Sequence, residues 1–280
     1  MQIELIETFL DLCETRSFTS TAERLEVTQS TVSARVAALE AKLGQRLFRR
    51  GRAGTALTEE GLRFEPHARV LRLAWVDAQR AVAMPAQANL AMRLGFQPDL
   101  VGERIGAWIA IIKSTLADTA LYLEASFSAH MSAELLSGAL DLGILFTPTP
   151  HPDLYYETLA EIRYQMVSSD AARVSKVDLD SYIVPDYSPA FLRSHAERLP
   201  DLAHALVTAG QSNLALSMQR RLGGTAYQPE ATAAMLVAEG GFLAVEDAPI
   251  LHQPVYGAVH IRNRHRAVHR RTMRAIAAGL

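Results

Sequence analysis

Residues 17–50 read Ser-Phe-Thr-Ser-Thr-Ala-Glu-Arg-Leu-Glu-Val-Thr-Gln-Ser-Thr-Val-Ser-Ala-Arg-Val-Ala-Ala-Leu-Glu-Ala-Lys-Leu-Gly-Gln-Arg-Leu-Phe-Arg-Arg. Ser17 is suited to cap one helix and Thr28 a second, because a hydroxyl oxygen accepts a backbone N–H that the first helical turn leaves free. In the second helix, which runs to about residue 43, apolar residues recur at the helical period: Val32, Val36, Leu39 and Leu43. The stretch therefore predicts two helices joined by a short turn.

The opposite face of the second helix carries hydrogen-bonding side chains at its N-terminal end. A helix that buries one side and presents short donors and acceptors on the other is suited to read base edges in a major groove. The pattern predicts a helix-turn-helix. Its candidate DNA contacts are Thr28, Gln29, Ser30, Thr31, Ser33 and Arg35.

Basic charge is concentrated just after these residues. Between Arg35 and Arg52 there are six basic residues and one acidic residue, although the whole chain has a net charge of −2. Gly51 and Gly54 suit a tight hairpin beside the second helix, which predicts a wing whose arginines contact phosphate. The candidates are Arg49, Arg50 and Arg52. The alternative is an amphipathic helix pair with a solvated basic end.

Many of these residues match a known signature in order and spacing. The matching segments are Phe9-Leu10, Ser17-Phe18, Ala22-Glu23-x-Leu25, Thr28-Gln29-Ser30-x-Val32-Ser33, Leu39-Glu40-x-x-Leu43-Gly44-x-x-Leu47-Phe48-x-Arg50 and Leu57-Thr58-x-x-Gly61. Together they resemble the N-terminal region of LysR-type transcriptional regulators. That family often has Arg directly after the serine of the recognition helix; here the position is Ala34, and Arg35 follows. The resemblance implies a winged helix-turn-helix in residues 1–58.

A long helix is expected from Thr58 to about residue 82. Thr58 can cap it, and Pro66 should kink it or loosen its first turns. Apolar residues recur along it in alternating steps of four and three, as in a coiled-coil seam. The seam predicts dimerisation through Phe64, Leu71, Trp75 and Val82. The resemblance likewise implies that residues 59–88 form a linker and dimerisation helix.

After a short linker at 84–88 the pattern changes to alternating strands and helices. Strands are expected at 90–96, 120–125, 142–146, 164–168, 205–208, 225–227, 242–245 and 255–261. Helices are expected at 102–116, 131–140, 213–222, 230–239 and 266–277. Two β-α-β sets predict parallel sheets in two lobes with a cleft between them. The same family resemblance implies a two-lobed α/β domain like periplasmic binding proteins over residues 89–280, with lobe I at 90–162 plus 262–280 and lobe II at 163–261.

Polar residues at strand ends and helix starts are the candidate effector contacts. A serine before a helix can offer its hydroxyl and backbone N–H to an anionic group, although such residues are usually plain helix caps. The candidates are Gln97, Asp99, Ser128, Phe146, Thr147, Ser212, Asn213 and Tyr227. A small organic acid is one candidate effector. The negative charge of Asp99 speaks against a simple monocarboxylate.

The remaining features limit the other function classes. No run approaches the ~20 apolar residues of a membrane span, and Cys13 is the single cysteine, so a cytoplasmic protein without an intramolecular disulfide is expected. His265 and His269 have metal-compatible spacing but lie among arginines, so neither a metal nor a cofactor is predicted. No nucleophile or phosphate-binding motif supports the alternative hypothesis of an enzyme acting on a small molecule. The expected partners are double-stranded DNA, further copies of the chain in a dimer or tetramer, a small-molecule effector and, as a further candidate, RNA polymerase.

Overall fold

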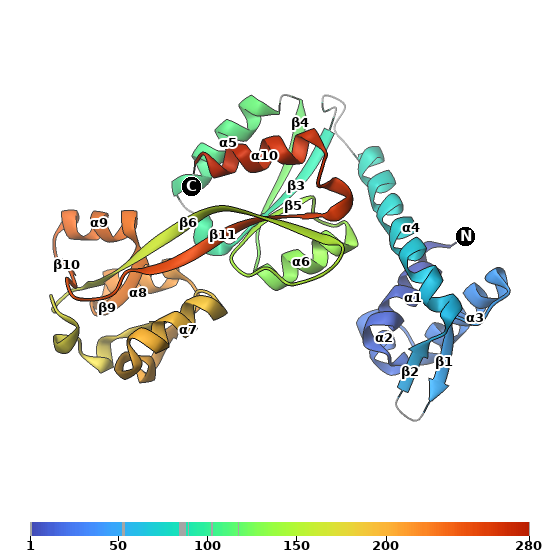
Figure 1. Ribbon diagram of the computed structural model, residues 1–280, viewed down its shortest axis with the longest axis horizontal. Helices are drawn as coiled ribbons and strands as arrows, with labels where there is room; N and C mark the ends of the chain where they lie inside the picture. Colours follow the sequence, from blue (N-terminus) through green and yellow to red (C-terminus); the bar gives the residue numbers. More distant parts are fainter. Residues whose placement is uncertain are drawn as a thin grey trace. The chain divides into compact units, whose positions relative to one another are not determined.

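The structure is a computed structural model that describes residues 2–51, 54–83, 88, 90–101, 103–116 and 118–279. The chain divides into two compact units, Met1–Pro85 and Ala86–Leu280 (Figure 1). Arg52 and most of the predicted 84–88 linker lie outside the described residues. Within the described part no helix is long and apolar enough to cross a membrane.

The N-terminal unit contains the predicted helix-turn-helix and hairpin. Its elements are α1 (Ile3–Thr15), α2 (Phe18–Arg24), α3 (Gln29–Leu43), β1 (Phe48–Gly51), β2 (Gly54–Leu57) and α4 (Glu59–Ala83). All three predicted caps are confirmed. The hydroxyls of Ser17, Thr28 and Thr58 accept the backbone N–H of Ser20 at 3.3 Å, of Thr31 at 3.2 Å and of Gly61 at 3.0 Å, respectively.

The core of this unit joins α1, α3, the hairpin and α4. Phe9 is fully buried and packs against Phe48 and Phe64 with ring centroids 5.2 and 5.1 Å apart. Val32, Val36 and Leu39 are buried as predicted. Leu43 is 41% exposed, so its expected place in the apolar stripe is wrong. Leu43 is the last residue of α3 and Gly44 follows in the left-handed conformation, so the chain turns away there.

Helix α4 continues through Pro66, and the kink or loosening expected at this residue stays a prediction. The predicted seam divides into two parts. Phe64 packs inside the N-terminal core, whereas Leu71, Trp75 and Val82 are 39, 44 and 90% exposed. The C-terminal half of α4 therefore presents apolar side chains that the N-terminal unit does not cover.

The C-terminal unit alternates strands and helices. Its strands are β3 (Leu90–Phe96), β4 (Thr119–Ala125), β5 (Leu142–Leu145), β6 (Leu154–Ser168), β7 (Ile183–Pro185), β8 (Val207–Ala209), β9 (Thr225–Pro229), β10 (Leu243–Ala244) and β11 (Leu251–His260). Its helices are α5 (Glu103–Thr115), α6 (Ser128–Ser137), α7 (Pro189–Arg198), α8 (Ser212–Leu222), α9 (Glu230–Glu239) and α10 (Ala267–Ala277). Short 3₁₀ turns include η1 (Pro98–Leu100).

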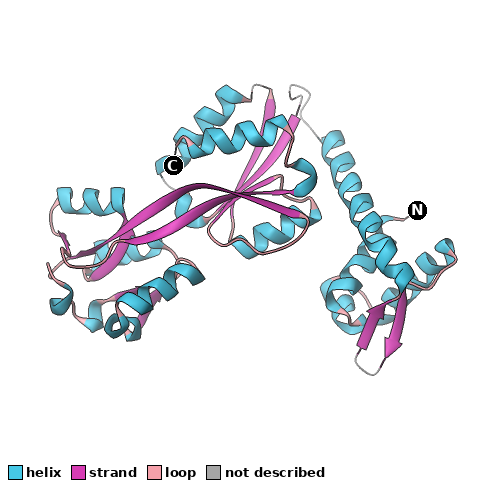
Figure 2. Cartoon of the chain, in the orientation of Figure 1, coloured by secondary structure: helices cyan, strands magenta, loops and turns pink. Residues whose placement is uncertain are grey.

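The sheet arrangement differs from two separate parallel sheets. Among the described strands, one seven-stranded mixed sheet has the order β10-β6-β11-β5-β3-β4, with β9 also pairing with β6, and β7 and β8 form a separate parallel pair. The long antiparallel strands β6 and β11 connect two groups of helices, α5, α6 and α10 at one end and α7, α8 and α9 at the other (Figures 1 and 2). This is a two-lobed α/β domain whose lobes share a sheet. The predicted lobe boundaries at 162/163 and 261/262 fall inside β6 and just after β11.

Candidate nucleic-acid interface and ligand cavity

The N-terminal end of α3 presents hydroxyl and amide groups to solvent. Thr28, Gln29 and Ser30 are exposed, and Thr31 is half-buried. The Oγ1 atom of Thr28 lies 2.8 Å from both the Ser30 Oγ and the Thr31 Oγ1 atoms, so these three hydroxyls form one hydrogen-bonded group. Such a group can donate to or accept from a base edge after a small rotation.

Further along α3, the candidate residues are less accessible. Ser33 and Arg35 are half-buried. The Arg35 Nη1 atom donates to the Thr8 Oγ1 atom at 3.3 Å, and Thr8 is fully buried in α1. This contact holds the arginine side chain against α1. The role of Arg35 at a base or a phosphate stays a prediction.

Glu40 has a structural role that sequence reasoning missed, since it was counted as the one acidic residue of the basic stretch and as part of the signature, without a contact of its own. Its carboxylate is buried, and its Oε1 atom accepts the backbone N–H of Leu47 at 2.8 Å and of Phe48 at 3.3 Å. Its Oε2 atom accepts from Arg46 Nη1 at 3.0 Å. Glu40 therefore fixes the start of the hairpin to α3. The available signal was the Leu39-Glu40-x-x-Leu43-Gly44 segment of the resemblance.

The hairpin pairs Phe48 with Leu57 and Gly51 with Gly54 in antiparallel register, which confirms the predicted hairpin. Arg49 is exposed on β1. The side chain of Arg50 lies outside the described part of the chain, as does Arg52. Arg46 is paired with Glu40, whereas Arg49 is an exposed cation on the described part of the hairpin, and its contact with phosphate stays a prediction.

The predicted effector residues fall into three separate places. The first is a polar cluster at the ends of β3 and β5. The Ser128 hydroxyl donates to Gln97 Oε1 at 3.0 Å and accepts the backbone N–H groups of Phe146 and Thr147, both at 3.2 Å. Ser128 is the first residue of α6 and is buried. Its proton is therefore committed to Gln97, and its predicted contact with an effector would require this cluster to open.

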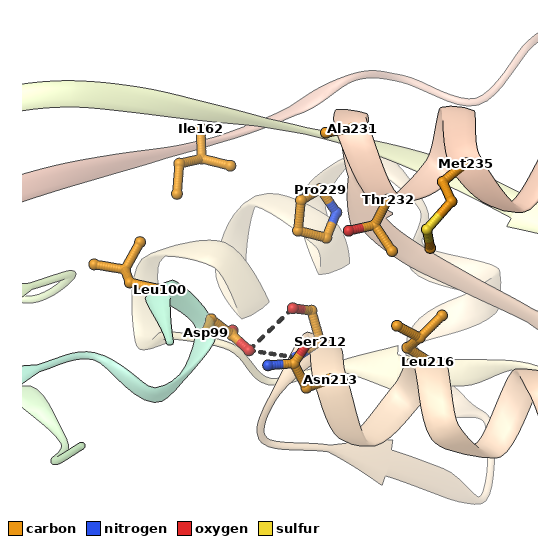
Figure 3. Close-up of a pocket in the computed structure, with 10 residues that line it drawn as sticks. All are labelled: Asp99, Leu100, Ile162, Ser212, Asn213, Leu216, Pro229, Ala231, Thr232 and Met235. Carbon is orange, nitrogen blue, oxygen red and sulfur yellow. Dashed lines mark hydrogen bonds between the residues drawn. The ribbon is translucent and has the colours of Figure 1, made fainter. Parts of the chain in front are cut away.

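The second place is a cavity of about 340 Å³ between η1 and the helices α8 and α9 (Figure 3). Asp99 comes from η1, whereas Ser212 and Asn213 begin α8. The Asp99 Oδ1 atom accepts from Ser212 N at 2.7 Å and from Ser212 Oγ at 3.0 Å. Asn213 Nδ2 donates to the Val101 carbonyl at 3.3 Å. Three of the eight predicted contacts thus meet at this cavity.

The third place is the core. Tyr227 is fully buried on β9, and its hydroxyl donates to the Pro249 carbonyl at 2.7 Å. It is not among the described residues that line the cavity. Leu216, Thr232 and Met235 do line it, although the sequence did not mark them. They lie on α8 and α9 as ordinary helix residues, so no sequence signal separated them from their neighbours.

Comparison with known proteins follows this division of the chain. Residues 3–62 match the family described as bacterial regulatory helix-turn-helix protein, lysR family, and residues 86–280 match the LysR substrate binding domain. The two matches together cover most of the sequence. The chain belongs to the LysR family. It is therefore a helix-turn-helix transcriptional regulator that carries a C-terminal ligand-sensing domain.

Individual LysR-family relatives span the full length. The HTH-type transcriptional regulator HdfR of Escherichia coli strain UMN026 is 30% identical over 266 residues, which is 94% of this chain and 93% of HdfR. Among solved structures, ArgP from Mycobacterium tuberculosis has a TM-score of 0.60 at 22% identity and covers 99% of this chain and 97% of its own. Full-length LysG from Corynebacterium glutamicum with bound effector Arg has a TM-score of 0.59 at 20% identity and covers 100% and 98%. These structures share the fold.

Proposed function

We propose that this LysR-family regulator reads DNA with the exposed N-terminal end of α3 and contacts phosphate with its hairpin. The cluster of hydroxyls of Thr28, Ser30 and Thr31 beside exposed Gln29 carries the proposal, because it lies at the N-terminal end of α3, the end of a recognition helix that contacts base edges in a major groove. Arg49 on the adjacent strand supplies a positive charge for the backbone. Ser33, Arg35, Arg50 and Arg52 complete the proposed interface.

The exposed apolar half of α4 supports a dimer. Leu71, Trp75 and Val82 leave apolar surface in contact with water, which a second copy of the same helix would cover. A two-fold dimer places two recognition helices on two half-sites of DNA. Because Phe64 already packs inside its own N-terminal unit, the proposed interface lies towards the C-terminal end of α4. A tetramer would be formed from two such dimers.

The cavity beside Asp99 supports control by a small molecule. It is lined from η1 on one side and from α8 and α9 on the other, so a ligand there contacts both lobes and can change their spacing. Such a change would alter the placement of the DNA-binding units in an oligomer. We place this regulator in the cytoplasm, where it would reach DNA and RNA polymerase.

Mapping of bound DNA across the genome tests the first part. Gln29→Ala and Ser30→Ala should each reduce the free-energy difference between the preferred and the wrong base by ~1–3 kcal/mol at the base that the side chain contacts. Arg49→Ala should weaken binding to all sequences alike and reduce the salt slope by about 0.9. Exposed Arg173 in the C-terminal unit provides a matched control, Arg173→Ala. Wild-type sites and wild-type salt dependence in all three interface variants would exclude this surface as the DNA reader.

A further inference from the structure

The last part of the chain is strongly basic. Residues 248–280 contain six arginines and neither an acidic residue nor a lysine, although the whole chain has a net charge of −2. All six are exposed: Arg262, Arg264, Arg266, Arg270, Arg271 and Arg274. The C-terminal unit therefore has a cationic surface of its own, made of different residues from the hairpin of the N-terminal unit.

Helix α10 presents several of these arginines on its outer face. Its inner face is buried through residues such as Met273 and Ile276, and the helix lies beside α5 (Figure 1). Arg266 directly precedes the helix, and Arg270 and Arg274 follow at intervals of four residues. The three therefore form a row along the outer face, with a spacing of about 6 Å along the helix axis.

Little negative charge of the protein balances this row. Helix α10 has no acidic residue in its first turn, where Arg266 meets the positive end of the helix dipole. Among the described residues, no carboxylate pairs with Arg266, Arg270 or Arg274, whereas α4 pairs two of its arginines with glutamates four residues earlier. Like charges four residues apart repel each other along a helix, so the row is suited to a partner that supplies negative charge.

Two neighbouring arginines are held by neutral groups and keep their charge. Arg271 Nη2 donates to the Thr115 carbonyl at 2.5 Å, and the Arg264 guanidinium carbon lies 4.5 Å from the centroid of the Tyr155 ring. Lys113 is exposed near the end of α5 and adds a further cation from the adjacent helix. The positive surface therefore extends beyond the row itself.

The composition of this surface selects the kind of partner. The cations of α10 are all guanidinium groups, whose forked N–H donors match the oxygens of a phosphate. Along Ala267–Ala277 no large apolar side chain is exposed, in contrast to a helix that inserts into a membrane or anchors a protein interface. Duplex DNA is a polyanion that a helix-turn-helix regulator already binds, and DNA held by one unit has a raised effective concentration at the other.

We propose that the outer face of α10 contacts the phosphate backbone of duplex DNA through Arg266, Arg270 and Arg274. This inference rests on the proposed function, in which the N-terminal unit binds the DNA, and adds a second contact surface to it. Phosphate contacts carry no base information, so α10 would add affinity and salt dependence without changing the sequence that α3 selects.

The affinity of the full-length protein for a random-sequence duplex of about 60 base pairs, measured over a range of salt concentrations, tests the proposal. The triple variant Arg266→Gln, Arg270→Gln, Arg274→Gln should bind about tenfold or more weakly. Its slope of log K against log salt should fall by about 2.7 per chain, since each lost phosphate contact removes about 0.9. A control variant removes the same charge from exposed arginines elsewhere in this unit and should keep the wild-type slope: Arg173→Gln, Arg193→Gln, Arg221→Gln.

Photo-cross-linking detects the contact itself. A benzophenone side chain in place of exposed Ala267 should cross-link to the duplex, whereas the same side chain in place of exposed Ser175 should not. The triple variant should keep the wild-type size in sedimentation and an equal or higher thermal unfolding temperature, because it removes like-charge repulsion along the helix. A loss of DNA binding would then not be due to misfolding.

Four results would each overturn the proposal: a wild-type salt slope in the triple variant, an equal loss of slope in the control variant, no cross-link at position 267, or a changed oligomer size. The last would assign this face of α10 to contacts between copies of the chain. A reduced slope in Arg49→Ala beside an unchanged slope in the triple variant would remove the α10 contact and leave the proposed function standing.

Discussion

Replacing Glu40 by Ala should release the hairpin from α3. The carboxylate is buried between the last turns of α3 and the start of β1, where it accepts the N–H groups of Leu47 at 2.8 Å and Phe48 at 3.3 Å. Gly61 also packs closely against Leu47, because a Cβ at residue 61 would overlap the Leu47 carbonyl oxygen. The variant leaves the Leu47 N–H without its acceptor in a packed site.

The contacts set the size of the effect. Leu47 is buried, so losing its charged acceptor costs about 1.5–3 kcal/mol. The longer bond from half-buried Phe48 adds about 0.5–1 kcal/mol. Arg46 is 84% exposed in its side chain, so its ion pair at 3.0 Å contributes less than about 1 kcal/mol. The expected loss of local stability is therefore about 2–4 kcal/mol.

Hydrogen exchange of the full-length protein, followed by mass spectrometry, measures this quantity directly. Peptides covering residues 46–49 should exchange roughly 30 to 1000 times faster in Glu40→Ala, since each 1.4 kcal/mol is a factor of ten. Arg46→Ala, which removes only the exposed partner, should stay within about fivefold of wild type. Glu40→Gln should fall between them. Exchange in Glu40→Ala within fivefold of wild type would refute the assigned role of this carboxylate.

Two further outcomes follow from the same geometry. The double variant Leu71→Glu, Trp75→Glu should convert the proposed oligomer to monomers or aggregates, because the two carboxylates would lie in the proposed apolar contact between helices. Sedimentation at micromolar concentration measures the change. A folded oligomer of wild-type size would contradict the interface. Ser128→Val should destabilise the C-terminal unit by about 1–3 kcal/mol in thermal unfolding, since two N–H groups and an amide lose their partner.

The N-terminal unit was predictable because its signals are local. Ser17, Thr28 and Thr58 each accept an N–H three residues later, so a cap can be identified from a few adjacent residues. The hairpin likewise follows from two nearby glycines. The misplaced side chain in this unit, Leu43, sits where α3 ends, and periodicity alone does not mark the last residue of a helix.

The C-terminal unit was predicted less completely because its sheet depends on long-range pairing. The first part of β6, up to residue 163, carries charged and exposed residues such as Glu157 and Glu161, so no apolar pattern indicated a strand there. It forms because β11 supplies backbone partners about a hundred residues later. The same pairing turns the expected parallel sets into one mixed sheet. Strand β7 and helix α7, between residues 183 and 198, were also missed.

Ser128 and Ser212 show why a binding site is harder to identify than a fold. Each is the first residue of a helix, and the two are indistinguishable as helix-start serines in the sequence. Gln97, 31 positions away, accepts a hydrogen bond from the Ser128 hydroxyl, so this hydroxyl already has a partner within the protein. Asp99, 113 positions away, accepts from Ser212 N and Oγ with one oxygen, so this helix start also has its partner within the protein. What distinguishes the two helix starts is thus the distant residue that pairs with each serine, an amide at Ser128 and an acid at Ser212, and neither pairing can be identified from residues adjacent in the sequence.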